Sequence, residues 1–175
     1  KVENNIVFTK GTPRRKKKLK GKILSLLTGG AGNDNYFHWM YDVLPRIGIC
    51  EKVIDISKID YFLLPSIEKK YQTETLDVLN IPRHKRLSSK FYRHVVTSEI
   101  IITQHPYCIK NDASNEIQNI PIWISQWLKE KCLQSDYEKD DSPKKIYIDR
   151  SDSQSNINKL RLIVNETEVK NFLKK

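Results

Sequence analysis

The chain has 175 residues, 38% hydrophobic and 30% charged, a composition that suits a globular chain able to bury a core in one domain or two small lobes. No apolar run approaches the roughly 18–20 residues of a membrane span, and no signal peptide is visible. Three widely spaced cysteines without a CxxC pair argue against a structural zinc site and against a disulfide framework, and they fit a reducing compartment.

Much of the net charge of +10 lies in one short segment, which begins at Arg14 and ends at Lys22. Seven of its residues are basic, and such a run can bind an anionic membrane surface, a nucleic acid or an acidic polymer. It can equally be a solvated arm. Because it lacks the interleaved aromatic residues of a single-strand binder, and no nucleic-acid motif occurs elsewhere, we expect no nucleic-acid partner. Residues 1–21 are therefore predicted to form a basic lead-in or arm, with peripheral membrane contact through residues 14–22 as one alternative.

Apolar runs and turn residues predict strands that alternate with helices along the rest of the chain. The expected strands are a short one at 6–8, then 22–27, 60–64, 94–96, 100–102 and 145–148. A first helix is expected to begin near residue 35. Further helices are expected at 71–79, 121–133 and 164–173, the last of them capped by Asn165. Residues 105–120 are predicted to be a loop, and the polar, acidic stretch 134–144 is predicted to be a linker.

This alternation predicts an α/β fold with a largely parallel sheet, in which ligands bind at the carboxyl ends of the strands. A glycine-rich turn at residues 28–35 leads from a strand into a helix, with Asp34 or Asn35 as its N-cap. The turn resembles a phosphate-binding loop in outline, but it matches neither GxGxxG nor the Walker pattern, and its glycines can equally serve a tight turn. The segment 29–46 and Arg150 both follow predicted strands, so both fall where a ligand would be held.

Residues 35–46 carry a polar stripe inside an otherwise apolar segment. On a helix that turns by roughly 100° per residue, apolar side chains gather on one side and four chemically distinct polar groups on the other. The apolar side consists of Tyr36, Met40, Val43, Leu44, Ile47 and Cys50. The polar side consists of Asn35, His38, Asp42 and Arg46, with Trp39 next to it. These groups are typical of a site, whereas an ordinary solvated face is mostly Lys, Glu and Gln.

The alternative interpretation is a surface pair, in which His38 and Asp42 add a few tenths of a kcal/mol to the helix. Pro45 favours a site, because a proline inside a helix costs roughly 3 kcal/mol and ends or kinks it. The polar stripe would then lie near an irregular helix end that ligands can reach.

The chemistry available to this stripe is proton transfer. His38 or Asp42 could act as a general base, since a carboxylate beside an imidazole orients it and holds its tautomer. A metal at these two residues would need at least one further ligand. Arg150 suits the capture of phosphate or carboxylate, or a salt bridge to a neighbouring aspartate. The other histidines lack ligand spacing and are predicted to be structural or surface residues: His84, His94 and His105.

Two pairs of short motifs follow one another in a defined order. Residues 35–39 read Asn-Tyr-Phe-His-Trp, and residues 42–46 read Asp-Val-Leu-Pro-Arg. Further along, residues 146–150 read Ile-Tyr-Ile-Asp-Arg, and residues 161–169 read Arg-Leu-Ile-Val-Asn-Glu-Thr-Glu-Val. In this order and spacing, over residues 22–173, the chain resembles glycosyltransferase family 61, with Asp149 where the family usually has Ser.

The resemblance implies a GT-B-type, inverting and metal-independent transfer of a sugar from a nucleotide-sugar donor to a glycan acceptor. Residues 22–133 would form a Rossmann-like acceptor-side lobe, 134–144 the linker, and 145–175 the start of a donor-side lobe. The chain begins with Lys1, ends in the pattern of a helix cut off in mid-run, and lacks the family's later His-Gly-Ala-Gly region. We therefore expect the donor-side lobe to be truncated.

The resemblance also implies parts for single residues. The catalytic base is expected at His38 or Asp42. No metal is expected, and no cofactor besides the nucleotide-sugar, which is itself a substrate. The expected substrate-binding residues are Asn35, Trp39, Arg46, Arg150 and Arg161, the last two facing the donor's diphosphate.

Bacterial members of the family take part in capsular or other surface polysaccharide synthesis, and the bias towards Lys, Asn and Ile suggests a bacterial gene. We accordingly expect a cytoplasmic protein, peripheral to the inner membrane where the basic segment contacts lipid. Two other hypotheses remain. One is a basic binding module for an anionic polymer or membrane surface without catalysis. The other is a structural domain whose polar stripe is a solvated helix face.

Overall fold

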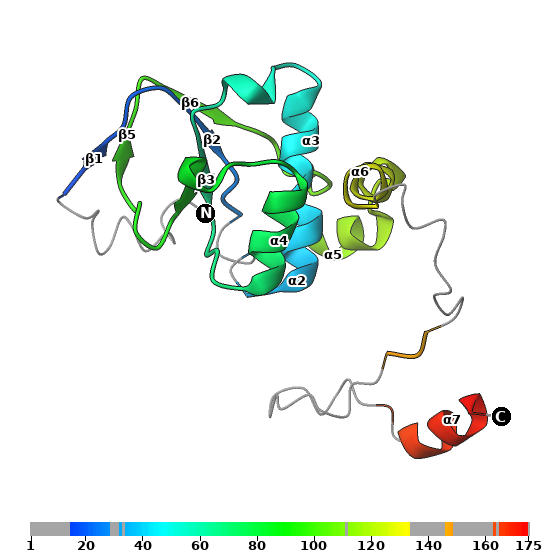
Figure 1. Ribbon diagram of the computed structural model, residues 1–175. Helices are drawn as coiled ribbons and strands as arrows, with labels where there is room; N and C mark the ends of the chain where they lie inside the picture. The colour runs from blue at the N-terminus through cyan, green and yellow to red at the C-terminus, as the bar shows by residue number, and fades with distance from the viewer. Residues whose placement is uncertain are drawn as a thin grey trace. The chain divides into compact units, whose positions relative to one another are not determined.

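The computed structural model describes residues 15–28, 32, 34–110, 112–133, 146–148, 163 and 165–174. The chain divides into two compact units, residues 1–137 and residues 138–175. The first unit contains the parallel sheet and the helices that pack on it (Figure 1). The predicted linker, residues 134–144, lies outside the described residues.

Four parallel strands form the main sheet of the described part of the chain, in the order β4-β3-β2-β6. They are β2 (Lys22–Ser25), β3 (Tyr61–Leu64), β4 (Arg86–Ser88) and β6 (Glu99–Ile102). β2 lies between β3 and β6. This arrangement confirms the predicted α/β fold with a parallel sheet and is consistent with a Rossmann-like lobe. The sequence pattern does not predict β4, because Leu87 is its only apolar residue.

A shorter pair, β1 (Lys17–Lys18) and β5 (Val95–Val96), precedes two strands of this sheet. β1 leads into β2 and β5 leads into β6, and both pairs are parallel. The register shifts by one residue between the pairs, so the first strand carries one extra residue, as in a β-bulge. Gly21 permits this, because its φ of +113° is a conformation that residues with a side chain rarely adopt. Part of the predicted basic arm is therefore a paired strand, while residues 1–14, with the predicted strand at 6–8, lie outside the described residues.

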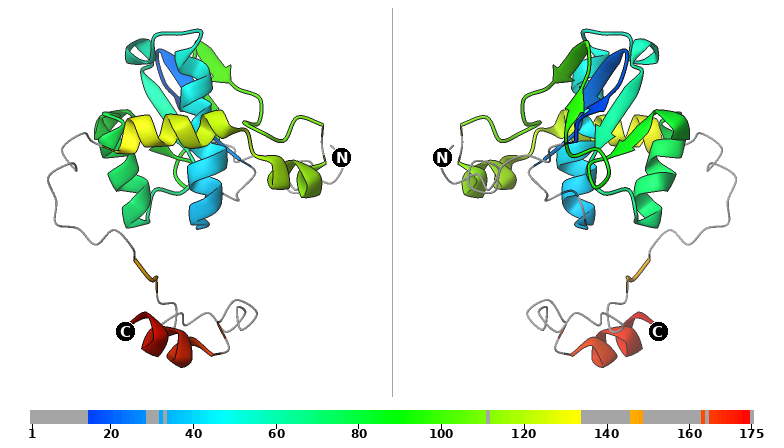
Figure 2. Two further views of the ribbon diagram at one scale, coloured as in Figure 1. Left: turned by 90° about the vertical axis from the view of Figure 1, so that its right-hand side faces the viewer. Right: turned by 90° about the vertical axis from the view of Figure 1, so that its left-hand side faces the viewer.

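Helices follow the strands and pack on one face of the sheet. After β2 the chain forms a single helical run of α2 (Tyr36–His38), the π-helix η2 (Trp39–Val43) and α3 (Pro45–Glu51). α4 (Lys70–Val78) follows β3, and α6 (Ile122–Cys132) begins directly after Pro121. Figure 2 shows α6 in yellow, crossing the other helices, and it contacts both α3 and α4. The helices predicted at 71–79 and 121–133 are thereby confirmed.

Short helical turns occupy parts of the chain where no helix is predicted. The expected loop at 105–120 contains α5 (Ala113–Glu116) and the 3-10 helix η5 (Ile117–Asn119), so that prediction is wrong in this part. Two further 3-10 helices are η3 (Ile56–Lys58) and η4 (Arg83–Lys85). Each is about one turn long, too short to show a helical stripe of apolar residues.

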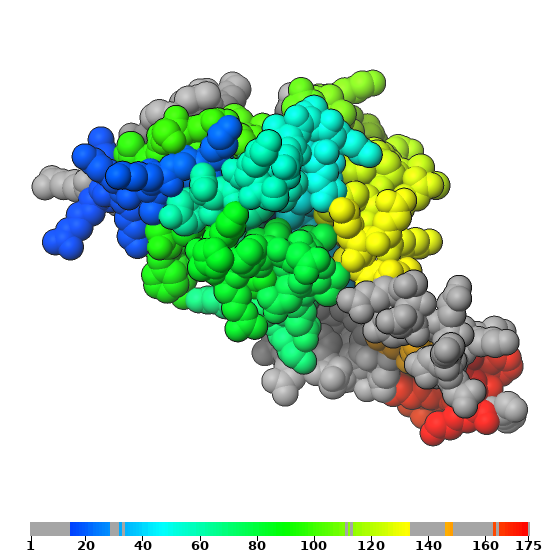
Figure 3. Space-filling view, turned by 45° about the horizontal axis from the view of Figure 1, so that its top comes forward, coloured from blue at the N-terminus to red at the C-terminus, as the bar shows by residue number. Residues whose placement is uncertain are grey.

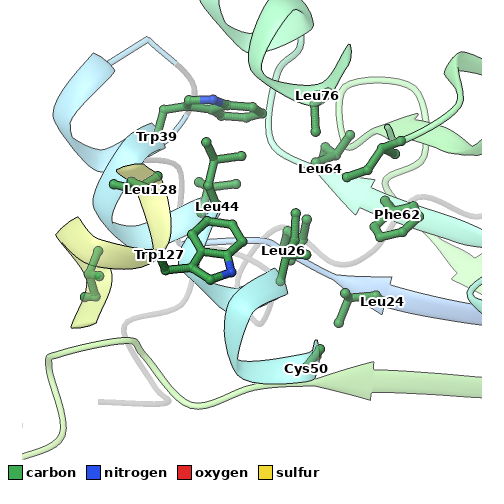
Figure 4. Packing of buried hydrophobic residues seen from close by; sticks show 14 of the residues in the cluster. Leu24, Leu26, Trp39, Leu44, Cys50, Phe62, Leu64, Leu76, Trp127 and Leu128 are labelled. Atoms are coloured by element: carbon green, nitrogen blue, oxygen red, sulfur yellow. The ribbon is translucent and has the colours of Figure 1, made fainter. Parts of the chain in front are cut away.

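Both faces of the sheet are apolar, because successive residues of each strand point to opposite sides. The face away from the helices buries Ile23, Leu63 and Leu87, with Leu19 and Val95 packed against them. This burial on both sides explains why the central strands β2 and β3 lie in nearly continuous apolar runs of the sequence. The helix side of the core includes Leu24, Leu26, Leu44, Phe62, Leu64, Leu76 and Trp127 (Figure 4).

The second unit is described only in part. Residues 146–148 have no strand conformation, so the strand predicted at 145–148 is not found in its described residues. α7 (Glu166–Leu173) begins after Asn165, which confirms the predicted last helix and its N-cap position. The hydroxyl of Tyr147 donates to the Glu166 carboxylate at 2.8 Å. Among the described residues, no helix is both long and apolar enough to span a bilayer.

We expect Gly48→Ala to destabilise the protein by about 1–3 kcal/mol, as overpacking a well-filled core does. A Cβ on Gly48 would lie 2.9 Å from Cε2 of Trp127, whose side chain is buried and donates to Glu51. The sign is diagnostic, because Gly→Ala in an uncrowded helix raises stability by up to about 1 kcal/mol. Denaturant unfolding measures the change. Combining Gly48→Ala with Trp127→Phe should cost less than the sum of the two single changes, and simple additivity would contradict the proposed clash.

Candidate active site

The predicted polar stripe lies at the carboxyl ends of two adjacent strands, where parallel sheets bind their ligands. The helical run α2-η2-α3 follows β2, and the chain leaving β6 carries Thr103, His105 and Tyr107. Because β2 pairs with β6, residues some sixty positions apart in the sequence meet at this edge.

The helical run is irregular in a way that the sequence partly indicates. Asn35, one of the two predicted caps, begins it, and its side-chain oxygen accepts from the backbone N–H of Phe37 at 2.9 Å. In η2 the N–H of Leu44 donates to the carbonyl of Trp39 at 3.1 Å, five residues back. Pro45 then takes the first position of α3, where its missing N–H costs nothing. The predicted helix interruption at Pro45 is confirmed, and its form is a π-helical turn.

The burial of side chains along this run differs from the expected stripe. Tyr36, expected on the apolar side, is 57% exposed, whereas Trp39 has no exposed surface. Asp42 and Arg46 are 4% and 8% exposed, so the hypothesis of a solvated helix face is wrong for these two residues. A π-turn adds a residue to one helical turn and so rotates the following side chains relative to a regular α-helix.

His38 and Asp42 form the centre of the site. Nδ1 of His38 lies 2.7 Å from Oδ2 of Asp42. Since a carboxylate only accepts, we assign the proton of this hydrogen bond to Nδ1, which leaves the lone pair of the neutral ring on Nε2. The His38 side chain is 30% exposed and that of Asp42 6%. The imidazole can therefore reach a ligand, while the carboxylate behind it sets its orientation.

A second imidazole faces the same carboxylate oxygen. Nδ1 of His105 accepts from the backbone N–H of Cys108 at 2.9 Å, so the neutral ring carries its proton on Nε2, which lies 3.7 Å from Oδ2 of Asp42. Burial lowers the pKa of His105, and the nearby Arg46 acts in the same direction, although Asp42 opposes both. The prediction that His105 is a structural or surface residue did not anticipate its position beside Asp42, although its hydrogen bond with the loop backbone agrees with a structural part. Its place just after the predicted strand at 100–102 was the available signal.

Tyr107 completes the surroundings of the carboxylate. It is 7% exposed, and its burial together with the neighbouring Asp42 carboxylate raises the pKa of its phenol. Oδ1 of Asp42 is buried and has no hydrogen-bond partner among the described residues. The sequence does not indicate Tyr107, because its approach to Asp42 depends on the path of the chain after β6.

Arg46 ties the helical run to the end of β6. Its Nε donates to the backbone carbonyl of Asp42 at 2.9 Å, and its Nη1 donates to the carbonyl of Thr103 at 3.1 Å. Burial lowers the pKa of its guanidinium, an effect that the charge of Asp42 partly opposes. Arg46 thus holds the two halves of the site together and supplies a positive charge close to Asp42.

The remaining predicted site residues differ in position. Trp39 is fully buried and its Nε1 donates to the Thr75 hydroxyl at 2.9 Å, so it supports the helical run from within the core. Arg150 and Arg161 lie outside the described residues. Within the described ranges, no cluster of three or more His, Cys, Asp or Glu side chains is arranged to hold a metal ion.

Comparison with known families gives the class of protein. Residues 36–175, most of the chain, match the family model described as Glycosyltransferase 61. The chain therefore belongs to glycosyltransferase family 61, and it is a glycosyltransferase domain. Comparisons with curated proteins and with solved structures gave no match.

Glu116 gives a prediction about pH, because its carboxylate organises the loop after His105. It accepts from the backbone N–H groups of Ile109, Lys110 and Asp112 at 2.6, 2.8 and 3.1 Å. These bonds lower the pKa of Glu116 from 4.5 to about 2. A depressed folded-state pKa means that the contribution to stability is complete above the ordinary pKa of 4.5 and is lost as the pH falls towards about 2.

We therefore expect Glu116→Gln to destabilise the protein near neutral pH, with a difference from wild type that shrinks between pH 5 and pH 2. Chemical unfolding of both proteins across this range measures it. If the difference in unfolding free energy between the two proteins does not vary with pH, the ionised Glu116 carboxylate does not stabilise the loop.

Proposed function

We propose that this protein transfers a sugar from a nucleotide-sugar donor to a hydroxyl group of a glycan acceptor, with inversion at the anomeric carbon. Family membership supports sugar transfer in general. The observation that carries the finer proposal is the hydrogen bond between the half-buried His38 and the buried Asp42 at the carboxyl end of β2.

In the proposed step, Nε2 of His38 removes the proton of the acceptor hydroxyl while that oxygen attacks the anomeric carbon. The new glycosidic bond forms as the bond to the donor's diphosphate breaks on the opposite face, and the electron pair leaves with the nucleoside diphosphate. Asp42 stabilises the imidazolium that results. Since its carboxylate is almost entirely covered, we assign Asp42 as a positioning residue and His38 as the base.

The donor side of the reaction is proposed from the motifs. Arg150 and Arg161 would stabilise the departing diphosphate, since guanidinium groups bind phosphate through paired hydrogen bonds. We propose a GT-B arrangement without a metal ion, in which residues 22–133 serve the acceptor and residues 145–175 serve the donor. Asn35 would organise the base through the helix cap, and Arg46 through its two backbone contacts. The proposed setting is cytoplasmic synthesis of a bacterial capsular or other surface polysaccharide.

His38→Ala and Asp42→Asn should each reduce transfer by about 10²–10⁴-fold, the usual contribution of a positioned general base, the second because the imidazole loses the carboxylate that orients it. The assay measures release of nucleoside diphosphate across a panel of nucleotide-sugars and glycan acceptors. His84→Ala is the matched control, because His84 is exposed in η4 and should leave the rate unchanged. If His38→Ala keeps the wild-type rate while remaining folded, the assignment of the base fails, and the same result for Asp42→Asn would remove the positioning role of Asp42.

The basic segment supports a second proposal, contact with an anionic membrane surface. Arg15, Lys16, Lys18 and Lys20 are exposed. Figure 3 shows this stretch in blue on the surface. Two neighbours have contacts of their own, because Lys17 lies 4.1 Å from the ring centre of Tyr92 and Lys22 pairs with Glu99. Cations near an anionic leaflet contribute roughly 1 kcal/mol each.

Neutralising Lys16, Lys18 and Lys20 to Gln should therefore lower binding to vesicles containing phosphatidylserine by at least about tenfold. Co-sedimentation with vesicles measures this, and neutral phosphatidylcholine vesicles should bind neither protein. The matched control neutralises three other exposed lysines, Lys52, Lys110 and Lys129. Equal losses in both triple variants would mean that net charge, not this segment, attracts the membrane.

A further inference from the structure

A cavity of about 650 Å³ opens beside the candidate site, between the end of α3, the strand β6 and the chain that leaves β6. Its volume lies within the range of roughly 300–1,000 Å³ found for small-molecule sites. None of the functional steps proposed above uses it. Its walls include residues from three separate segments of the first unit, 48–53, 101–109 and Trp123, so the fold and not one loop shapes it.

The wall of this cavity has a polar part and an apolar part. Thr103, Gln104 and His105, which are consecutive, supply the polar groups. Most of the other walls are apolar and include Ile102, Ile109 and Trp123. A ligand that matches both parts is amphipathic, with hydroxyl groups at one end and a hydrocarbon or aromatic body at the other.

The polar residues of the cavity also contact the candidate active site. Thr103 accepts from the guanidinium of Arg46, and His105 faces the same oxygen of Asp42 that binds His38. Because both imidazoles approach one oxygen atom, the polar groups of the cavity lie near the proposed base. An acceptor sugar placed there would be close to the reacting groups, while anything attached to it would extend along the apolar walls.

Several apolar side chains that line the cavity are exposed to water, so a ligand that covers them would gain free energy of binding. Val53, Ile102 and Ile109, which line the cavity, are 79%, 73% and 66% exposed. Covering such surface contributes about 25 cal/mol for each Å² removed from water. The single charged residue among the described lining residues is Lys52, so an apolar group can enter without covering an acidic side chain.

We propose that this cavity is a subsite for an apolar aglycone of the acceptor, an alkyl or aryl group joined to the sugar that receives the transferred residue. The inference rests on the proposed function, because it assigns the bound sugar to the acceptor. The cavity then selects acceptors that carry an apolar group over free sugars, and the Thr103–His105 groups hold the sugar beside the base.

Equilibrium binding tests this selection without requiring turnover. The probes are methyl, phenyl and n-octyl β-D-glucoside, used below their aggregation limits and measured by isothermal calorimetry on the full chain. The phenyl or octyl glucoside should bind at least about tenfold more tightly than the methyl glucoside, because apolar surface is covered. A preference for octyl indicates a lipid-like aglycone, and a preference for phenyl indicates an aromatic one.

The variant Ile102→Asp should abolish this preference, because it places a carboxylate in the cavity. Ile122→Asp is the matched control, since Ile122 is 74% exposed but does not line the cavity, and it should keep the preference. Thermal unfolding checks that both variants fold. Should Ile102→Asp fail to fold, Ile109→Asp provides the same test at another wall position.

Equal affinity for all three glucosides, or an equal effect of the two variants, would overturn the proposal. A different result would contradict the proposed function alone: the glucosides bind with the expected preference, but no nucleotide-sugar supports transfer. Conversely, transfer to free sugars at the same rate as to their octyl or phenyl glycosides leaves the function intact and removes the apolar subsite.

Discussion

The burial of the Asp42 carboxylate is the constraint on which the site depends. A charged or polar group removed from water is tolerated only where other groups compensate it, and Asp42 is almost completely covered. Its Oδ2 faces the imidazoles of His38 and His105. Arg46 lies on the same helical run and anchors it to Thr103. The groups that surround this one carboxylate come from two segments, the helical run after β2 and the chain after β6. The site therefore forms only where these two segments are held together.

The π-helical turn is the local feature that makes this possible. The turn begins at the buried Trp39 and contains the buried Asp42, and Pro45 then starts the next helix without losing a hydrogen bond. π-turns are rare, and those that occur are frequently found at functional sites. Here the turn begins at Trp39, which is fully buried and bonded to Thr75.

The hydrogen bond between His38 and Asp42 suits the chemistry of the family to which the chain belongs. The chain belongs to a glycosyltransferase family, and sugar transfer to a hydroxyl requires a group that removes a proton. An imidazole that is partly exposed and held by a buried carboxylate is suited to that task. The polar residues of the neighbouring cavity contact Asp42 and Arg46, so the proposed acceptor subsite lies beside the proposed base.

Local sequence patterns predict the α/β class, the helical segment that carries the polar residues, its interruption at Pro45, and a cap at either Asp34 or Asn35. These follow from local properties, namely apolar runs, capping side chains and the missing N–H of proline. The sequence did not determine β4 or α5, which are too short to show a pattern, and it predicted a strand at 145–148 that the described residues there do not form. The burial of Asp42, the place of Trp39 in the core and the approach of His105 and Tyr107 to the site are seen first in the three-dimensional fold. The reason is that these contacts connect residues far apart in the sequence, through the pairing of β2 with β6 and the rotation produced by one π-turn.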